Sequence, residues 1–312
     1  MRVLILGATG FAGRHLADEL ARQGHEVVGA ARRVSADARL AGGGHLLRCD
    51  VTRREEVDAV LAESAAAAVV LLAGLSSPPA AQADPEAAYR VHALGAVHLL
   101  AAAAARRPAP RVLLVTSSEV YGEVGPADLP LTEEAPLRPT TIYAASKAAA
   151  DLAARAFARS LDLDVVRVRA FNHTGPGQRR DFVCADFAAQ VAAISAGRRP
   201  PLMEVGNLDA ERDFTDVRDI VRGYAAALLR GRPGEVYNLC SGRPTRIGAI
   251  LEDLCALAGV RPEVRVAAER RRRAEVPAYW GSAAKAEAEL GWRPEIPWRR
   301  TLSDLLRDQT AE

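Results

Sequence analysis

Apolar residues in the first half of the chain form short continuous runs that alternate with segments of helical spacing. Val3-Leu4-Ile5-Leu6 is one such run, and Phe11, Leu16 and Leu20 then recur on one helix face. A continuous apolar run is typical of a parallel strand that is buried on both faces. The pattern predicts strands at 3–6, 25–30, 46–49, 69–72, 112–115 and 165–170, and helices at 11–23, 53–66, 85–106 and 141–161.

These repeated strand–helix units imply right-handed crossovers and therefore an α/β fold, a Rossmann-type doubly wound parallel sheet, over residues 1–170. After residue 171 proline and glycine become frequent, and short strands such as 235–240 alternate with helices of mixed length. We expect residues 171–312 to form mostly a smaller mixed α/β substrate-binding lobe, with some segments returning to the first domain. The cleft is expected at the carboxyl ends of the strands, where open α/β sheets bind ligands.

The overall charge and the cysteines restrict the partners of this protein. Lys plus Arg number 41 and Asp plus Glu number 39, which gives a net charge of +2. The overall charge therefore does not indicate binding to nucleic acid or to an acidic membrane. The alanine runs near residues 65–68 and 101–105 are too short to span a bilayer. The four cysteines form no C-x-x-C pair, which favours buried thiols in a reducing cytoplasm. We expect a cytoplasmic protein without a metal, nucleic-acid or membrane partner.

A glycine-rich turn joins the first predicted strand to the first helix. Gly7, Gly10 and Gly13 lie in GATGFAG, with Thr9 and Phe11 between them. Glycines permit a tight turn and let backbone N–H groups approach a pyrophosphate at the helix N-terminus. The context predicts a dinucleotide site, to which the ends of later strands add Asp50, Val51, Ala73 and Gly74.

The end of the second strand bears on which dinucleotide is bound. It reads Ala30-Ala31-Arg32-Arg33, without the acidic residue that bonds the ribose 2′-OH of NAD. Arginine pairs with phosphate through two N–H groups. Arg32 and Arg33 therefore favour NADP(H), and NAD(H) stays possible if both side chains only face solvent.

Tyr143 and Lys147 lie four residues apart on the predicted helix 141–161, so they share one face. An ammonium group beside a phenol favours the phenolate and lowers the pKa of the phenol. We therefore expect Tyr143 to exchange a proton near neutral pH. Together with a dinucleotide, this pair indicates proton and hydride chemistry on an alcohol or ketone.

Taken together, these segments resemble the extended short-chain dehydrogenase/reductase superfamily, which acts on nucleotide sugars. The resemblance covers essentially the whole chain, and FNHTGPGQ is most similar to reductases of GDP-4-keto-6-deoxy-mannose. It implies NADPH-dependent reduction of the C4 ketone of GDP-4-keto-6-deoxy-D-mannose to GDP-D-rhamnose. The matching segments are GATGFAG, SSEVYG at 117–122, YAASK at 143–147, FNHTGPGQ at 171–178, RDFTDVRDIVRGY at 212–224 and the tail at 275–298.

The resemblance also implies roles for single residues. Lys147 would bind the nicotinamide ribose, Tyr143 would protonate the sugar O4, and Ser117 would hydrogen-bond the same oxygen. Members of the superfamily usually form dimers, which implies a homodimer through helices 85–106 and 141–161. The substrate, a nucleoside-diphosphate sugar and by resemblance a GDP-sugar, would be held by Ser118, Asn172, Arg179, Arg212, Arg272 and Glu275.

Glu119 leaves the reaction open. Dehydratases of the superfamily place a Glu here as the base that removes the C5 proton, so GDP-mannose 4,6-dehydratase is the alternative to the reductase. A 4-epimerase and a non-catalytic NADP(H) sensor are further alternatives. Intact Ser117, Tyr143 and Lys147 argue against the sensor.

His92 stands where the superfamily commonly has Asn, within the predicted helix 85–106. That Asn helps to hold the catalytic lysine and a proton path. A histidine could take over its hydrogen bonds. It could also titrate and make the activity more dependent on pH.

Overall fold

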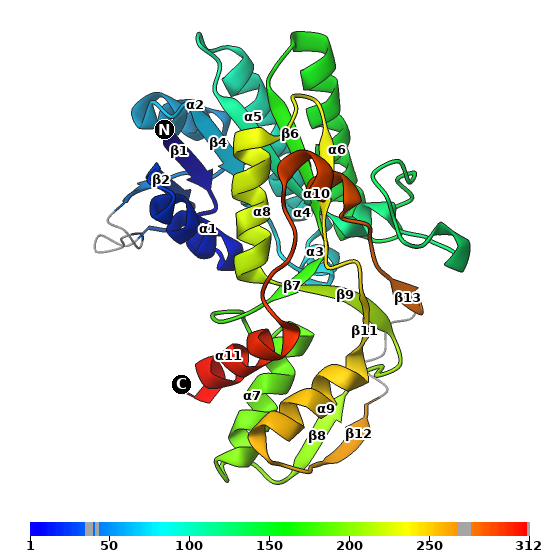
Figure 1. Cartoon of the computed structure of the whole chain (residues 1–312). Coiled ribbons are helices and arrows are strands. Elements are labelled where there is room, and N and C mark those ends of the chain that lie inside the picture. Colours follow the sequence, from blue (N-terminus) through cyan, green and yellow to red (C-terminus); the bar gives the residue numbers. More distant parts are fainter. Residues whose placement is uncertain (35–39, 41–43, 268–275, 311–312) are drawn as a thin grey trace.

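The computed structural model describes residues 1–34, 40, 44–267 and 276–310. Its centre is a seven-stranded sheet, ordered β10-β6-β5-β4-β1-β2-β3, in which every pairing is parallel (Figure 1). The predicted α/β, doubly wound parallel sheet is thereby confirmed. The strands are β1 (Arg2–Leu6), β2 (Glu26–Ala31), β3 (His45–Arg48), β4 (Ala68–Leu71), β5 (Arg111–Ser117), β6 (Val165–Ala170) and β10 (Val236–Leu239).

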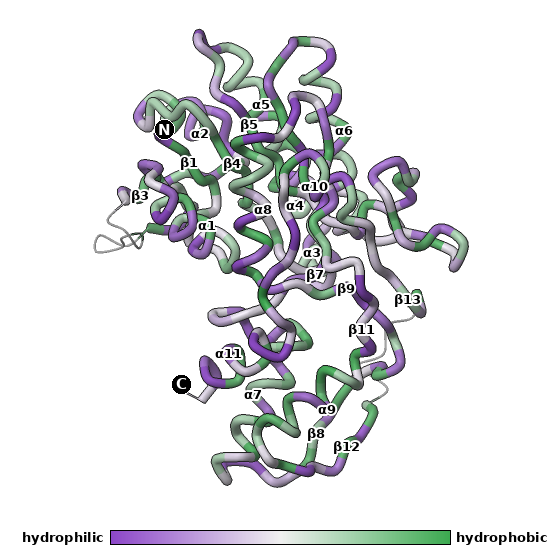
Figure 2. Tube along the Cα trace, in the orientation of Figure 1, coloured by the Kyte–Doolittle hydropathy of each residue, from purple (hydrophilic) through white to green (hydrophobic). Residues whose placement is uncertain are grey.

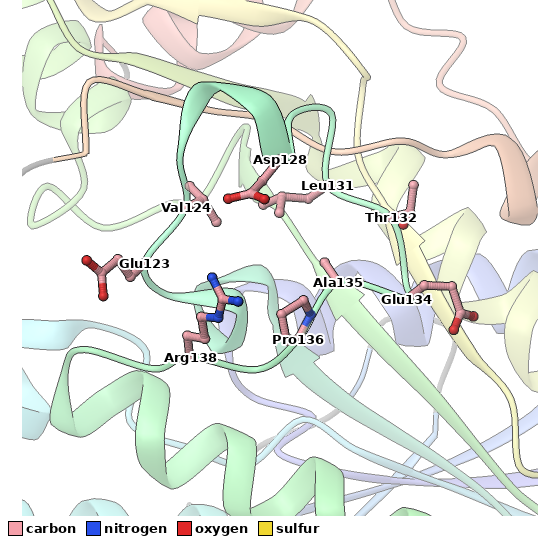
Figure 3. Close-up of a pocket in the computed structure, with 9 residues that line it drawn as sticks. All are labelled: Glu123, Val124, Asp128, Leu131, Thr132, Glu134, Ala135, Pro136 and Arg138. Carbon is pink, nitrogen blue, oxygen red and sulfur yellow. The ribbon is translucent and has the colours of Figure 1, made fainter.

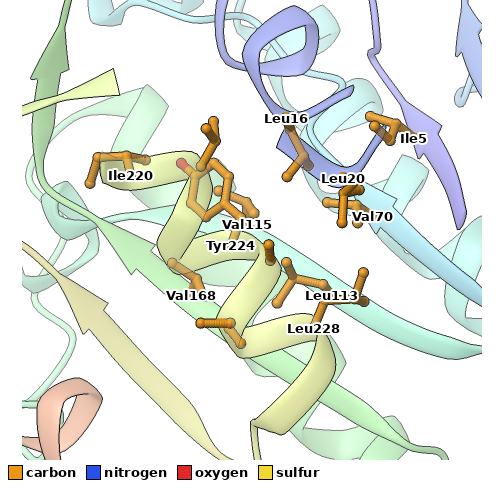
Figure 4. Packing of buried hydrophobic residues seen from close by; sticks show 14 of the residues in the cluster. Ile5, Leu16, Leu20, Val70, Leu113, Val115, Val168, Ile220, Tyr224 and Leu228 are labelled. Carbon is orange, nitrogen blue, oxygen red and sulfur yellow. The ribbon is translucent and has the colours of Figure 1, made fainter. Parts of the chain in front are cut away.

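Both faces of this sheet are covered, because successive side chains of a strand point to opposite sides. In β1, Val3 and Ile5 belong to one hydrophobic core, and Leu4 and Leu6 belong to a second. Hydrophobic residues follow the central strands β1, β4 and β5 (Figure 2). The first core lies under α1 (Phe11–Arg22) and α8 (Val217–Arg230), as Figure 4 shows, and the second under α2 (Arg54–Ser64), α5 (Gly95–Ala104) and α6 (Ile142–Leu161).

The helix that carries Tyr143 has clear chemical boundaries. α6 begins after Thr141, whose hydroxyl oxygen accepts a hydrogen bond from the backbone N–H of Ala144 at 3.1 Å. It ends at Asp162, which has the left-handed φ of 51°. The Thr141 cap fixes the first helical turn, and this turn positions Tyr143.

The predicted helix 85–106 is one continuous element with a change of winding inside it. It consists of α4 (Pro85–Tyr89), a π-helical turn at Arg90–Leu94, and α5. By length and composition the stretch Pro85–Ala104 could cross a membrane. Its buried side packs against α2 and α6, so a helix of the folded core accounts for it equally well.

The rest of the chain builds two smaller sheets and a third core. β9 (Glu211–Asp216) pairs with β7 (Asn172–Thr174), β11 (Pro244–Arg246) and β13 (Ala278–Tyr279), and β8 (Leu202–Val205) pairs with β12 (Glu263–Val266). Figure 1 shows β7 and β9 between the large sheet and the lobe of β8 and β12. Three helices share the core of this lobe: α7 (Val183–Ser195), α9 (Ile247–Ala258) and α11 (Trp298–Thr310).

Some of the later elements lie with the first half of the chain. β10 adds a parallel strand beside β6, α8 packs against α1, and α10 (Ala284–Leu290) packs against α8. The division into 1–170 and 171–312 stays a prediction, and these three elements are the segments of the second part that would return to the first.

Candidate active site

The glycine-rich turn between β1 and α1 is shaped by close backbone contacts. Gly7 has a φ of +96°, and a Cβ added there would lie 2.6 Å from the backbone nitrogen of Ala73. A Cβ on Gly13 would lie 2.2 Å from the carbonyl oxygen of Gly7. No side chain caps α1 at Gly10, so the N–H groups of its first turn can bind an anion. This backbone cradle fits the pyrophosphate of a dinucleotide.

Other predicted cofactor residues lie at the ends of neighbouring strands. Ala73 follows β4, and its N–H donates to the carbonyl of Leu6 at 2.9 Å. A Cβ on Gly74 would lie 3.4 Å from the Lys147 ammonium nitrogen, so this loop lies against Lys147. Thr9 is exposed in the glycine turn, and Phe11 is half-buried where α1 begins.

Asp50 and Val51, at the end of β3, are engaged by the protein itself. The Asp50 carboxylate accepts hydrogen bonds from the N–H and the hydroxyl of Thr52, at 3.0 and 2.8 Å. These bonds and nearby arginines hold the pKa of Asp50 below its usual range, although partial burial acts in the opposite direction. Val51 is buried and lies close to Gly95 in α5. A contact with the dinucleotide therefore stays a prediction for both.

The carboxyl ends of β2 and β3 form a basic hollow. Arg32 and Arg33 line it together with Val34 and Arg48. The sequence did not predict Arg48 as a cofactor residue. It lies at the end of β3, a strand that was predicted from its apolar residues. The hollow is lined by three guanidinium groups, which fits the 2′-phosphate of NADP(H) better than a bare ribose.

Ser117, Glu119 and Tyr143 come together beyond the end of β5. The Ser117 hydroxyl oxygen accepts a hydrogen bond from the Glu119 N–H at 3.2 Å. Burial raises the pKa of Tyr143, the Glu119 carboxylate raises it further, and a hydrogen bond from Ser117 works in the opposite direction. The expectation that Lys147 lowers this pKa is therefore wrong for the protein alone. Removal of the phenol from water disfavours the charged phenolate, and this effect on the pKa is larger than any effect of the lysine four residues away.

Lys147 lies on the same helix and is only 9% exposed. Its ammonium nitrogen lies 3.5 Å from the carbonyl oxygen of Val115, to which it donates. Burial lowers the pKa of Lys147 to about 8. The lysine is thus charged at neutral pH and loses its proton in mildly alkaline solution.

His92, in the π-helical turn, links the loop after β4 to α6. The Leu75 N–H lies 3.0 Å from His92 Nε2, and His92 Nδ1 lies 2.8 Å from the Ser146 hydroxyl. That hydroxyl donates to the Tyr143 carbonyl at 2.8 Å. All three bonds form only if Nδ1 carries the proton and Nε2 accepts. The other tautomer would donate to the Leu75 carbonyl at 3.1 Å, but it leaves the Leu75 N–H without its acceptor.

The same imidazole also contacts the catalytic phenol. Its ring meets the Tyr143 ring edge to face, with centroids 5.5 Å apart. Burial, and then the charge of Lys147, lower the pKa of His92 to about 3. The idea that His92 titrates near neutral pH is wrong, because a charged ring would be desolvated beside an ammonium group.

The predicted substrate residues come from adjacent strands of the small sheet. Asn172 on β7 donates from Nδ2 to the Asp213 carbonyl at 3.3 Å. Arg212 on β9 is opposite Tyr279 on β13 and donates to the Glu211 and Pro277 carbonyls. The strand register places Asn172 opposite Phe214, two residues from Arg212 along β9, so both residues belong to the same small sheet.

The remaining substrate predictions differ in placement. Arg179 is exposed, pairs with Asp181 at 2.7 Å and donates to the Ser76 hydroxyl at 3.2 Å, so it reaches the loop after β4. Ser118 is only 4% exposed, which limits its reach toward a ligand. Arg272 and Glu275 lie outside the described residues.

Tyr279 and Asp213 are two further residues of this site that sequence reasoning left without a role. Tyr279 is buried against Phe171, its hydroxyl donates to the Ser118 carbonyl, and the Glu119 carboxylate is among the causes that raise its pKa after burial. Both residues stand inside segments that carry the resemblance. Their contacts involve residues far along the chain, which no local pattern reveals.

A separate cavity of about 290 Å³ lies in the segment between β5 and α6 (Figure 3). None of the predicted site residues in the described part of the chain lines it. The charged residues among its described lining are Glu123, Asp128, Glu134 and Arg138. Three carboxylates around one guanidinium would repel a diphosphate, so this cavity is not suited to a nucleotide sugar.

Comparison with known proteins agrees with this geometry. The family model described as GDP-mannose 4,6 dehydratase matches residues 4–305. The GDP-6-deoxy-D-mannose reductase of Pseudomonas aeruginosa is 38% identical over 241 residues, which cover 77% of this chain and 79% of that protein. The UDP-glucose 4-epimerase of Corynebacterium glutamicum is 28% identical, over 97% of this chain and 93% of its own length.

Solved structures extend the likeness over the whole chain. The structure of RMD from Pseudomonas aeruginosa complexed with NADPH aligns with a TM-score of 0.86 and 34% identity, covering 99% of both chains. The UDP-glucose 4-epimerase of Thermus thermophilus in complex with NAD aligns with the same TM-score at 26% identity, again covering 99% of both. Fold, site and relatives agree: the chain belongs to the GDP-mannose 4,6-dehydratase family of extended short-chain dehydrogenases/reductases and is an NAD(P)-dependent nucleotide-sugar oxidoreductase.

Proposed function

We propose that this protein reduces the C4 ketone of GDP-4-keto-6-deoxy-D-mannose with NADPH and releases GDP-D-rhamnose. The observation that carries the proposal is 38% identity over 77% of the chain to a GDP-6-deoxy-D-mannose reductase. The arginines at the end of β2 and the likeness to a structure complexed with NADPH support NADP(H) as the cofactor. The glycine cradle would hold its pyrophosphate, and Lys147 its nicotinamide ribose.

In this reaction the cofactor supplies a hydride to C4, and the protein supplies a proton to O4. Tyr143 would donate that proton, since burial keeps its phenol protonated in the resting site. Ser117 would hydrogen-bond the same oxygen and stabilise the negative charge that develops on it. The charged Lys147 would then assist the return of a proton to the phenolate.

The same proposal assigns the substrate to the cleft beside the small sheet. Arg212 and Asn172 would bind the diphosphate and the sugar, with Arg179 closing from the loop after β7, and the guanidinium groups suit the diphosphate charge. Ser118 would contribute through its backbone rather than its buried side chain. Arg272 and Glu275 stay sequence-based candidates.

A dehydratase activity on GDP-mannose is the second candidate, and Glu119 favours it. The Glu119 carboxylate is among the causes that raise the pKa of Tyr143, which supports a position of Glu119 close to the phenol. A carboxylate next to the proton donor is the arrangement that proton removal from C5 would require.

Two parallel assays separate the candidates. The first mixes the protein with NADPH and GDP-4-keto-6-deoxy-mannose and follows reduced nicotinamide, and the second mixes it with GDP-mannose and NADP⁺. We expect NADPH loss in the first alone, a fall of about 10²–10⁴-fold in Tyr143→Phe with NADPH binding retained, and little change in Glu119→Gln. Keto-sugar formation in the second assay that disappears in Glu119→Gln would instead make the protein a dehydratase.

We also propose a homodimer formed by the long helix 85–104 and α6. These helices pack side by side and leave large apolar side chains in solvent: Tyr89, Leu94 and Leu152 are 44, 43 and 52% exposed. Large apolar side chains exposed on packed helices are a feature that a protein interface would cover. Burial in a dimer would also account for the apolar composition of Pro85–Ala104.

A further inference from the structure

Three arginines converge at one corner of the large sheet. Arg32 and Arg33 follow β2, and Arg48 ends β3, where its Cα pairs with that of Ala31. Parallel pairing therefore puts Arg48 directly beside the residue that precedes Arg32. All three side chains line the same open hollow, and Val34 is the other described residue that lines it.

The ion pairs around this corner leave out the three arginines that line the hollow. Within the described residues none of them has a carboxylate at ion-pair distance, whereas the neighbouring Arg53 and Arg54 pair with Glu56 and Asp58 at 3.1 and 2.9 Å. The hollow is therefore a site of positive charge that the described part of the protein does not neutralise by direct contact.

Among the described residues, the Asp50 and Glu56 carboxylates interact electrostatically with Arg32 and Arg48, respectively, but both carboxylates are already engaged by other hydrogen bonds. Asp50 accepts from Thr52, and Glu56 accepts from the Asp50 N–H at 2.8 Å and from Arg53. Like charges at one edge repel one another unless an anion lies among them. The cluster is therefore arranged for an external anion.

We propose that Arg48 is a specificity-determining residue that binds the 2′-phosphate of NADPH together with Arg32 and Arg33. The hollow lies at the end of β2, where the adenosine ribose of a dinucleotide held on the β1–α1 turn is placed. A phosphate monoester with two negative charges matches several guanidinium donors, whereas the 2′-OH of NADH offers them no charge. This inference rests on the proposed NADPH preference and adds a residue from a second strand to it.

The test measures binding of 2′,5′-ADP and of 5′-AMP, which lacks only the 2′-phosphate, to the full chain by calorimetry. We expect Arg48→Gln to weaken 2′,5′-ADP binding by about tenfold or more, the range for a hydrogen bond to a charged group, and to leave 5′-AMP binding unchanged. Arg54→Gln, which removes the same charge from a paired arginine nearby, is the matched control and should bind both ligands like the parent. Arg48→Lys should fall between, since it keeps the charge and loses the planar fork.

The outcomes distinguish the role of Arg48 from the NADPH preference on which it rests. If Arg32→Gln loses 2′,5′-ADP binding and Arg48→Gln does not, Arg48 does not bind the 2′-phosphate, while the NADPH preference stands. If the parent binds 2′,5′-ADP no better than 5′-AMP, the preference itself fails and Arg48 fails with it. Inorganic phosphate should compete with 2′,5′-ADP more strongly than with 5′-AMP, and equal competition against both would place the anion site at the 5′-phosphate instead.

Discussion

At the scale of single residues, burial decides the protonation of the candidate catalytic residues and of His92 beside them. It raises the pKa of Tyr143, lowers that of Lys147 to about 8 and lowers that of His92 to about 3. Each shift disfavours the charged form, as removal from water does. The i, i+4 spacing of Tyr143 and Lys147 was visible in the sequence. The direction in which the pKa of Tyr143 shifts could not be predicted. Segments far from Tyr143 in the sequence bury the phenol and bring Glu119 close to it.

These directions fix the expected pH dependence. His92 stays neutral above about pH 3, so it should add no inflexion between pH 5 and 8. Lys147 is protonated below about pH 8 and loses its charge above it, so kcat/KM for NADPH should fall as the pH rises through that value. The measurement is a profile of kcat/KM from pH 5 to 10.

Two variants assign the inflexions of that profile. Lys147→Arg should lack the alkaline inflexion, because arginine stays charged, although its rate is expected to be lower. His92→Asn should keep the shape of the parent profile. An acidic inflexion near pH 6.5 that vanishes in His92→Asn would contradict the neutral imidazole.

At the scale of elements, the apolar runs of the sequence predicted most of the large sheet. The six strands and four helices predicted in the first half lie within two residues of their observed ends. The π-helical turn at Arg90–Leu94 could not be predicted, because a local change of winding leaves the apolar spacing nearly intact. Short strands such as β7, β11 and β13 escaped because two or three residues carry no periodicity.

Asp213 in β9 is the residue on which the turn at 241–242 and the segment around Gly281 depend. Its buried carboxylate accepts from the Ser241 N–H and hydroxyl, both at 2.7 Å, and from the N–H groups of Gly242 and Gly281 at 2.9 and 3.4 Å. These bonds tie three distant segments together. The sequence showed the acid but not its partners.

Removal of the Asp213 carboxylate should therefore destabilise the small sheet. Each buried donor left without a partner costs roughly 1–3 kcal/mol, so Asp213→Ala should lower the free energy of unfolding by at least about 3 kcal/mol and the Tm by several degrees. Asp209→Ala, at an exposed position nearby, is the control. Equal melting curves for the two variants would mean that the donors find water or other acceptors.

At the scale of the whole molecule, the loop after β7 connects the cofactor half to the lobe. His15 in α1 bonds the Pro176 carbonyl at 2.9 Å, and the Gly177 N–H donates to Asp308 in α11 at 2.8 Å. Helices from the two ends of the chain are thus joined through two adjacent residues. The fold class and the cofactor cradle could be predicted from the sequence. This connection could not, because it joins residues that lie far apart in the sequence and belong to no common motif.

The proposed homodimer is tested at the same scale. Leu152→Asp puts a charge on the exposed face of α6 and should convert the dimer to a monomer in light scattering after size exclusion. Leu161→Asp is the matched control, because nine residues along a helix rotate it to the opposite side, and it is 58% exposed. A parent protein that elutes as a monomer, or a dimer lost equally in both variants, would contradict this interface.

The hydrogen bonds of His92 also make it a natural magnetic-resonance probe. A ring proton held on Nδ1 by a buried hydroxyl should exchange slowly with water and give a resolved signal far downfield, without any label on the ligand. The two ring nitrogens should have well-separated ¹⁵N shifts, the signature of one tautomer. With six histidines in the chain, assignment is feasible. Movement of that signal on adding a dinucleotide would report a change at the contact between the loop after β4 and α6.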